Sequence, residues 1–314
     1  MLTLSSVYKS YGDKVAVKNL SISVSSGEIY GMLGPNGAGK TSTIRMICGI
    51  TFPDKGEITF LGAAMDSELQ NRIGYLPEER GLYKKMKVGE QLLYLAELKG
   101  LAAPDAKVRI AAWMKRFEIE TWSGKKVEEL SKGMQQKVQF ISVLLHEPEL
   151  LILDEPFSGL DPINSELVME VILELKAAGK TIIFSTHRME QVEKICDSIA
   201  LINNGEKVLD GKVRDIKKSY GKNTLLIDFE GDDSFIDDLA AMGKVSISGR
   251  NPKSVELKLL DGSVMKDLIM FINDRTELTR IELAEPSLKE IFISSVGQSN
   301  AAIRTPKPAV PLPA

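Results

Sequence analysis

The fold is decided by Gly34-Pro35-Asn36-Gly37-Ala38-Gly39-Lys40-Thr41, a stretch that matches the phosphate-loop pattern G-x-x-x-x-G-K-[ST]. It follows an apolar, strand-like segment at Ile29–Leu33 and opens a helical pattern with Ile44, Ile47 and Ile50 on one face. Glycines adopt backbone dihedrals that other residues resist, so successive N–H groups of the loop can point toward the oxygens of a triphosphate. The sequence therefore predicts a strand, a phosphate loop and a helix in that order, within an α/β domain.

Two segments contain the residues expected to act on the phosphates, the phosphate loop and a run that ends at Asp154 and Glu155. Lys40 supplies a positive charge to the β- and γ-phosphates, and the Thr41 hydroxyl can hold Mg²⁺. The apolar run Leu150–Leu153 ends in two carboxylates, at the carboxyl end of a buried strand, where α/β folds bind ligands. We expect Asp154 to bind Mg²⁺ and Glu155 to orient and deprotonate the water that attacks the γ-phosphorus.

The overall composition is that of a globular protein with an ordinary core. Of 314 residues, 43% are hydrophobic and 26% are charged, which excludes collagen, coiled coil and general disorder. The 40 basic and 43 acidic residues give a net charge of −3, so no nucleic acid is expected as a partner. No stretch approaches the ~18 apolar residues of a membrane-spanning helix, and Met1–Tyr11 lacks the pattern of a signal peptide. Both observations predict a cytoplasmic protein.

Residues 1–218 are predicted to form the α/β domain, with a largely parallel sheet and a helical insert at about residues 78–145. Further strands are expected at Thr181–Phe184 and Ile199–Ile202, the latter returning through Asn204 and Gly205 as an edge hairpin. Within residues 219–298 the predicted order of elements is βαββαβ and a final helix, which indicates a small α+β unit of ferredoxin-like type. Four closely spaced prolines predict a disordered tail at residues 299–314.

Three further motifs point to a family. They are Leu130-Ser131-Lys132-Gly133-Met134-Gln135-Gln136, Ser158-Gly159-Leu160-Asp161 and Ser185-Thr186-His187. At these positions the sequence resembles the ATP-binding subunit of an ABC transporter, and the first motif discriminates, because kinases, GTPases and helicases share a phosphate loop. The resemblance runs from Tyr11 to about Tyr220 and implies a P-loop ATPase with a mixed sheet and a helical subdomain.

The resemblance also implies how the site is assembled. Ser131 and Gly133, at the start of a helix, are expected to face the nucleotide bound to a second copy, so that a head-to-tail homodimer holds two ATP molecules. Tyr11 is expected to stack on adenine, His187 to contact the γ-phosphate, and Asp161 to link the two sites, while it also caps a helix that begins at Pro162. The expected catalytic residues are Glu155, His187 and Lys40. The expected nucleotide-binding residues are Tyr11, Gly34, Asn36, Gly37, Ala38, Gly39, Lys40, Thr41, Ser42, Glu78, Ser131, Gly133, Gln135 and Asp161.

One residue departs from the family pattern. The family's usual glutamine after the strand that precedes the helical insert is replaced by Glu78. A carboxylate binds Mg²⁺ at least as readily as an amide, so Glu78 joins Thr41 and Asp154 as an expected metal ligand. We expect Glu78 to sense the nucleotide and to pass movement to the membrane partner.

Two shorter motifs, Leu76–Tyr83 and Glu285–Phe292, resemble the branch of type-two exporters that includes sodium-efflux and drug-resistance ATPase subunits. This resemblance implies a separate membrane-spanning permease, docking around Arg80–Lys87, and a location on the cytosolic face of the membrane. Residues 223–298 are expected to regulate the protein or support the dimer, or else only to add stability. The alternative function is a soluble ABC-type ATPase that acts on ribosomes or DNA, but one cassette without a long coiled-coil insertion fits neither class.

Overall fold

The computed structural model describes residues 1–221, 223–260 and 265–303. Its contacts divide the chain into two compact units, Met1–Gly211 and Lys212–Ala314. This boundary precedes the one expected after residue 218, so helix α8 (Val213–Ser219) belongs to the second unit. Among the helices of the described residues, none is both long enough and apolar enough to cross a membrane.

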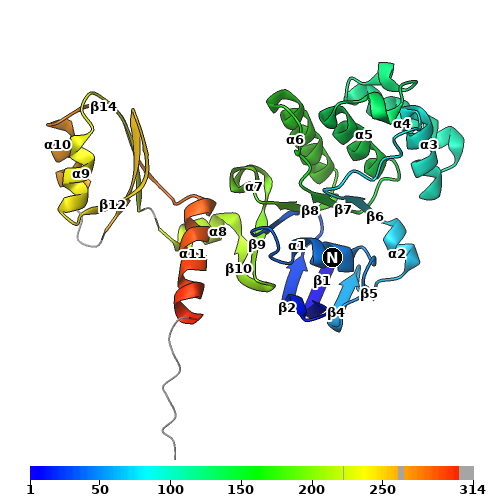
Figure 1. Ribbon diagram of the computed structural model, residues 1–314, viewed down its shortest axis with the longest axis horizontal. Helices are drawn as coiled ribbons and strands as arrows, with labels where there is room; N and C mark the ends of the chain where they lie inside the picture. Colours follow the sequence, from blue (N-terminus) through cyan, green and yellow to red (C-terminus); the bar gives the residue numbers. More distant parts are fainter. Residues whose placement is uncertain (222, 261–264, 304–314) are drawn as a thin grey trace, which may run out of the picture. The chain divides into compact units, whose positions relative to one another are not determined.

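The first unit contains a six-stranded sheet with the strand order β10-β9-β3-β8-β7-β6 (Figure 1). Its strands are β3 (Ile29–Leu33), β6 (Ile73–Leu76), β7 (Leu150–Asp154), β8 (Thr181–Thr186), β9 (Ser198–Asn203) and β10 (Glu206–Lys212). All residues of β3, β7 and β8 are buried, as is typical of central strands covered on both faces. The pairs β6–β7, β7–β8, β8–β3 and β3–β9 are parallel, which confirms the predicted sheet.

A second, antiparallel sheet has the strand order β2-β1-β4-β5. Its strands are β1 (Leu2–Tyr11), β2 (Lys14–Val24), β4 (Lys55–Phe60) and β5 (Ala63–Ala64), and the short helix α2 (Ser67–Asn71) follows them. Helix α1 (Lys40–Ile47) packs between the two sheets, since Ile44 and Ile47 share one buried cluster with Leu4 of β1 and Ile152 of β7. The phosphate loop and α1 are therefore held from both sides by apolar contacts.

The helices of the first unit lie mostly on the other face of the six-stranded sheet (Figure 1). The predicted insert contains α3 (Val88–Leu98), α4 (Ala103–Arg116), the 3₁₀ turns Glu120–Trp122 and Val127–Glu129, and α5 (Lys132–Leu144); α6 (Pro162–Ala177) and α7 (Met189–Ile195) follow. The ring of Phe117, after α4, lies 5.8 Å from that of Phe140 on α5, so the insert has an aromatic core of its own.

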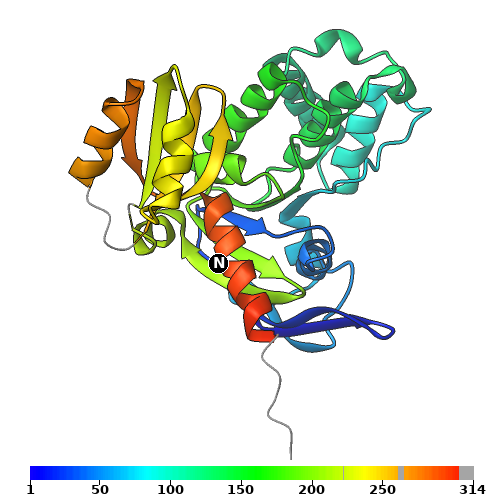
Figure 2. The same ribbon diagram turned by 60° about the vertical axis from the view of Figure 1, so that its left-hand side comes forward.

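The second unit has a four-stranded antiparallel sheet with the order β12-β13-β11-β14, the topology of a ferredoxin-like unit. Its further elements are β11 (Thr224–Glu230), α9 (Ser234–Ala241), β12 (Val245–Asn251), β13 (Ser254–Leu259), α10 (Met265–Asn273), β14 (Glu277–Ala284) and α11 (Leu288–Ile303). Helices α9 and α10 cover one face of this sheet (Figure 2). Helix α11 continues to Ile303, past the expected boundary at residue 299, and residues 304–314 of the predicted tail lie outside the described residues.

Candidate nucleotide-binding site

The phosphate loop joins the buried strand β3 to helix α1, and its shape requires glycine at its first position. Gly34 has a φ of 151°, and a Cβ atom there would lie 2.1 Å from the carbonyl oxygen of Ile202 on β9. The far side of the loop is fixed by the turn after β9, because the N–H of Gly205 donates to the carbonyl of Ala38 at 2.9 Å. Neighbouring strands therefore hold the backbone N–H groups of the loop in place.

Lys40 is the first residue of α1, and its side chain folds back over the loop. Its Nζ donates to the carbonyl oxygens of Gly34 at 2.6 Å and Pro35 at 3.1 Å, and only 8% of the residue is exposed. Burial lowers the pKa of Lys40, while the carboxylates of Glu155, Asp154 and Glu78 act in the opposite direction. A charged amine that is partly desolvated and bonded only to carbonyls is well suited to exchange those carbonyls for phosphate oxygens.

Asp154 and Thr41 come together beside Lys40. Asp154 ends β7, is almost completely buried, and has a pKa raised by burial and by the carboxylates of Glu78 and Glu155. The Thr41 hydroxyl donates to Asp154 Oδ2 over a long distance of 3.4 Å. In the described part of the chain, no three acidic, histidine or cysteine side chains form a complete cation site. This arrangement fits Mg²⁺, which is usually held by one or two protein oxygens together with substrate phosphates.

Glu155, the residue after Asp154, is tied to the end of β8. It adopts a φ of 51°, unusual for a residue with a side chain, and its N–H donates to the carbonyl of Ser185. Its Oε1 lies 2.6 Å from His187 Nδ1 and accepts from the His187 N–H at 2.9 Å, while its Oε2 accepts from the Thr186 hydroxyl at 3.0 Å. The carboxylate is only 14% exposed, whereas the His187 side chain is 58% exposed. Three donors thus fix the orientation of a carboxylate that can act as a base.

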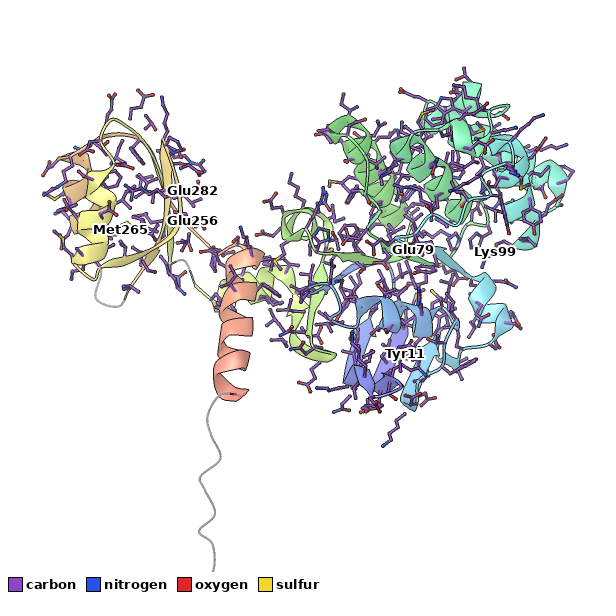
Figure 3. The ribbon with its side chains drawn as sticks, viewed as in Figure 1. Tyr11, Glu79, Lys99, Glu256, Met265 and Glu282 are labelled. Atoms are coloured by element: carbon purple, nitrogen blue, oxygen red, sulfur yellow. The ribbon has the colours of Figure 1, made fainter. Side chains whose placement is uncertain are left out.

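These groups surround one pocket of about 310 Å³. Its lining residues are Tyr11, Lys14, Ala16, Asn36, Gly37, Ala38, Gly39, Lys40, Thr41, Ser42, Glu78, Asp154 and Glu155. Tyr11, at the end of β1 (Figure 3), is 46% exposed, and an exposed aromatic ring can stack on a base. Gly34 and His187 are not among the lining residues; Gly34 acts through its bond to Lys40, and His187 through its bond to Glu155.

The remaining predicted ligands do not line this pocket. Ser131 is the N-cap of α5, and its hydroxyl accepts from the N–H of Met134 at 3.3 Å. The Gln135 amide donates to the carbonyl of Leu130 at 3.0 Å, so its side chain is directed back at the loop before α5. Asp161 caps α6, as its alternative structural role predicted, and both its oxygens accept from Asn164. Gly133 lies so close to Gly159 that a Cβ at Gly133 would be 2.8 Å from the Gly159 carbonyl oxygen.

Sequence reasoning missed three residues of the site. Lys14 and Ala16 line the pocket from β2, a strand that the motifs do not mark. Thr186 was quoted within the motif of His187 but was given no role, although it donates to Glu155. Its place between a buried strand and the motif histidine is the sequence signal that could have suggested one.

A phosphate loop on α1, an acidic end of β7 and a parallel sheet between helices define the class of P-loop nucleoside triphosphatases. Comparison with known proteins gives the family. Residues 17–158 match the family described as "ABC transporter", and residues 211–296 match the "ATP-binding protein DrrA1-3-like, C-terminal domain".

Individual relatives agree with this assignment. The chain is 44% identical over 299 residues to an uncharacterized ABC transporter ATP-binding protein, YhaQ of Bacillus subtilis strain 168, covering 95% of this chain and 99% of that one. It is 31% identical over 308 residues to the linearmycin resistance ATP-binding protein LnrL of the same organism, with the same coverage. A solved ATP-binding subunit of an ABC transporter superposes with a TM-score of 0.66 at 32% identity, covering 70% of this chain and 93% of that structure.

The chain therefore belongs to the ABC transporter family and is an ATP-binding subunit with an ABC ATPase domain. The expected function as a transporter ATPase and the expected fold are confirmed. The alternative of a soluble ATPase acting on ribosomes or DNA has no support, because these relatives are transporter and resistance subunits.

Proposed function

We propose that the chain is the ATP-hydrolysing subunit of an ABC exporter, bound to a separate permease on the cytosolic face of the membrane. ATP hydrolysis does no vectorial work without a path across the membrane, so a membrane-spanning partner has to supply that path. The name of LnrL, a relative similar over nearly its whole length, favours an antibiotic-like cargo over sodium. The permease selects the cargo, and this chain drives its transport.

The active form in this proposal is a head-to-tail homodimer, and one observation carries it. The ATP pocket is lined by the phosphate loop, Asp154 and Glu155, but Ser131 and Gly133 lie outside its lining. Ser131 instead caps α5 (Figure 1), a helix of the insert whose positive end can bind phosphate. A two-fold arrangement of two chains gives each ATP a phosphate loop from one copy and the start of α5 from the other.

Within each site, different protein groups bind the phosphates, stack on adenine and activate the water. Lys40 and the loop N–H groups bind the β- and γ-phosphates, Tyr11 stacks on adenine, and Glu155 takes the proton of the attacking water. His187 holds Glu155 and is exposed enough to reach the γ-phosphate. Mg²⁺, held by Thr41 and Asp154 with Glu78 nearby, would neutralise charge on the phosphates.

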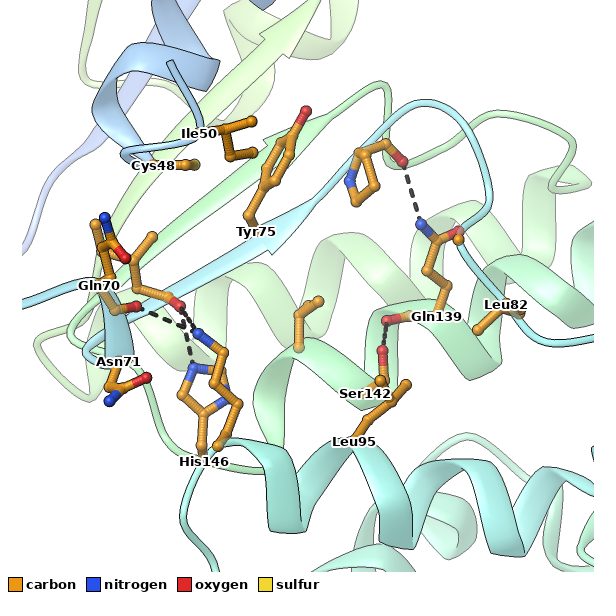
Figure 4. Close-up of a pocket in the computed structure, with 15 residues that line it drawn as sticks. Cys48, Ile50, Gln70, Asn71, Tyr75, Leu82, Leu95, Gln139, Ser142 and His146 are labelled. Carbon is orange, nitrogen blue, oxygen red and sulfur yellow. Dashed lines mark hydrogen bonds between the residues drawn. The ribbon is translucent and has the colours of Figure 1, made fainter. Parts of the chain in front are cut away.

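The permease is proposed to dock in a groove of about 390 Å³ on the first unit (Figure 4). The groove lies between α3, α5, β6 and the loop after β6, and Gly81 and Leu82 bring part of the expected docking segment into it. Its described lining contains no carboxylate, and Lys99 at the end of α3 donates to the carbonyls of Gln70 and Ile73 at 3.3 Å (Figures 3 and 4). A helix of the permease with apolar side chains and a carboxylate fits this groove.

Complementation between two inactive variants tests the shared site. Lys40→Ala removes the phosphate-binding amine but leaves α5 intact, whereas Ser131→Arg blocks the start of α5 but leaves the phosphate loop intact. An equal mixture should recover at most about a quarter of the wild-type ATPase rate, because half of the dimers are mixed and each has one complete site. A mixture as inactive as its components, in a preparation where both variants are folded, contradicts the shared site.

A second experiment tests turnover by Glu155. Glu155→Gln keeps the shape of the side chain but removes the base, so ATP turnover should fall at least about 100-fold. ATP should then hold the variant as a dimer, measured by light scattering after gel filtration. A Glu155→Gln chain that turns over ATP normally or stays monomeric with ATP would refute this part of the proposal.

A further inference from the structure

The loop after β6, residues 77–83, joins the proposed docking groove to the hydrolytic site. Pro77, Gly81 and Leu82 line the groove, while Arg80, between them, points to another part of the unit. Arg80 Nη2 donates to the carbonyl oxygen of Ser158 at 3.3 Å. Ser158 follows Glu155 by three residues, and its own N–H donates to the Glu155 carbonyl at 3.0 Å. One side chain thus connects the groove loop to the turn that carries the catalytic carboxylate.

The turn at Ser158–Gly159 is exposed to solvent but touches two neighbouring parts of the unit. A Cβ at Gly159 would lie 3.1 Å from Arg80 Nη2, and a Cβ at Gly133 would lie 2.8 Å from the Gly159 carbonyl oxygen. The turn therefore contacts the guanidinium of Arg80 on one side and the start of α5 on another. Because a hydrogen bond and a close contact join Arg80 to this turn, we expect a shift of Arg80 to displace it.

Two buried glutamines of α5 bind both loops. Gln139 Nε2 donates to the carbonyl of Pro77 at 3.3 Å (Figure 4), and Gln136 Nε2 donates to the carbonyl of Pro156 at 3.0 Å. The second polar atom of each amide, Oε1, is buried without a hydrogen-bond partner in the described structure, and so is Arg80 Nε. Unpaired buried donors and acceptors are costly, so these three atoms can take new partners when the loops move.

We propose that Arg80 is a positioning residue that carries movement of the groove loop to the turn Ser158–Gly159 and so sets the rate of hydrolysis at Glu155. The inference rests on the proposed docking of the permease in the groove. Docking against Gly81 and Leu82 displaces the loop, Arg80 displaces the turn, and Glu155 and Asp161, on either side of that turn, move with it. Arg80 itself touches neither ATP nor the attacking water.

Kinetics of the purified full chain test the link. Arg80→Ala should lower kcat for ATP about tenfold and change KM less than twofold, because Arg80 does not line the ATP pocket. Arg80→Lys should recover part of kcat, since its amine can still donate to the Ser158 carbonyl. Arg116→Ala is the matched control: Arg116 is an arginine of the same insert, bonded to Glu170 and Glu174 on α6, and its loss should leave kcat unchanged.

A bulky adduct in the groove tests whether movement of the groove loop changes the rate of hydrolysis through Arg80. Leu82→Cys provides a thiol for a biotin maleimide, and all these variants also carry Cys48→Ala, because Cys48 lines the same groove and is partly exposed. The other cysteine, Cys196, is buried, and burial raises the pKa of its thiol. The adduct should change kcat at least threefold when Arg80 is present and less than 1.5-fold in Leu82→Cys/Arg80→Ala. Should Arg80→Ala fail to fold, Leu82→Cys/Arg80→Lys replaces it, with an intermediate response expected.

Equal kcat values for wild type and Arg80→Ala, or an adduct effect that persists without Arg80, would overturn the inference. The proposed docking has a separate test, which is copurification of a membrane protein with the wild-type chain. If no membrane protein copurifies but the adduct still acts through Arg80, the docking proposal fails and the Arg80 link is supported.

Discussion

Replacing Thr186 with valine tests how the carboxylate of Glu155, the proposed catalytic base, is held. The Thr186 hydroxyl donates to Glu155 Oε2 at 3.0 Å and accepts from the N–H of Arg188 at 3.1 Å. Thr186 is the last residue of β8 and is fully buried, and valine has nearly the same shape and a high strand propensity. Thr186→Val therefore removes the hydroxyl while the strand is kept.

The magnitude follows from the bonds that remain. A hydrogen bond to a charged group contributes about 1.5–3 kcal/mol, and each 1.4 kcal/mol lost from the transition state lowers a rate tenfold. Glu155 keeps two donors from His187, so we expect the lower end of this range, a fall of about tenfold in kcat. KM for ATP should change less than twofold, because Thr186 does not line the ATP pocket.

The assay is steady-state ATPase activity together with thermal unfolding, and β8 supplies its own control. Thr181 begins the same strand, is also fully buried, and accepts from the N–H of Gly27 at 2.9 Å. Thr181→Val should lower the unfolding temperature about as much as Thr186→Val but leave kcat unchanged, and Thr186→Ser should restore kcat. If Thr186→Val and Thr181→Val have the same kcat, the bond from Thr186 does not position Glu155 for catalysis.

Three further predictions concern the loop, the antiparallel sheet and the acidic pocket. Gly34→Ala should lower the free energy of unfolding, measured with urea, by at least about 2 kcal/mol, because the added Cβ meets the Ile202 carbonyl. Gly62 also has a positive φ but lies in open space, so Gly62→Ala should lower it by only about 1 kcal/mol. Equal losses in the two variants would contradict the clash at Gly34. Hydrogen bonds from Lys9 and Ser10 lower the pKa of Asp54 to about 2 from an ordinary 3.8, so the stabilisation by this carboxylate is complete above pH 3.8 and lost as pH falls to 2. Asp54→Asn should therefore unfold at a lower temperature than wild type at pH 7. A difference in unfolding temperature that persists below pH 2 would exclude this carboxylate as the cause. Glu78→Gln should bind metal-free ATP about two- to fivefold more tightly in calorimetry, because one of three carboxylates in the pocket becomes neutral, and unchanged affinity would show that Glu78 does not face the phosphates.

Local sequence patterns predicted those elements of the fold that form from residues close together in the chain. The strand at Ile29–Leu33, the run ending in Asp154 and the βαββαβ order of the second unit follow from short apolar runs and turn residues. The antiparallel sheet was missed because β1 has register shifts and a positive φ at Ser6, which interrupt the alternation of apolar and polar residues. Its pairing with β4 also joins residues about 50 positions apart, which no local pattern encodes.

In the candidate site, too, local motifs predicted some residues and contacts and could not predict others. The motifs pointed to Lys40, Asp154 and Glu155, which line one pocket in the structure, because the chemistry of phosphates demands those residue types at that spacing. They could not reveal the bond from Arg80 to Ser158, which spans 78 positions, or the contact of Glu155 with the end of β8. Such contacts depend on which strands become neighbours, and that is decided by packing of the whole sheet.

The cap formed by Asp161 has a consequence for assembly. In the proposed homodimer Asp161 faces the second copy, and its side chain is ordered before the two copies meet, because both its oxygens are already bonded to Asn164 within one chain. Little side-chain entropy of Asp161 then remains to be lost on association. In the proposed cycle, the start of α6 therefore does not have to be ordered again each time the pair closes.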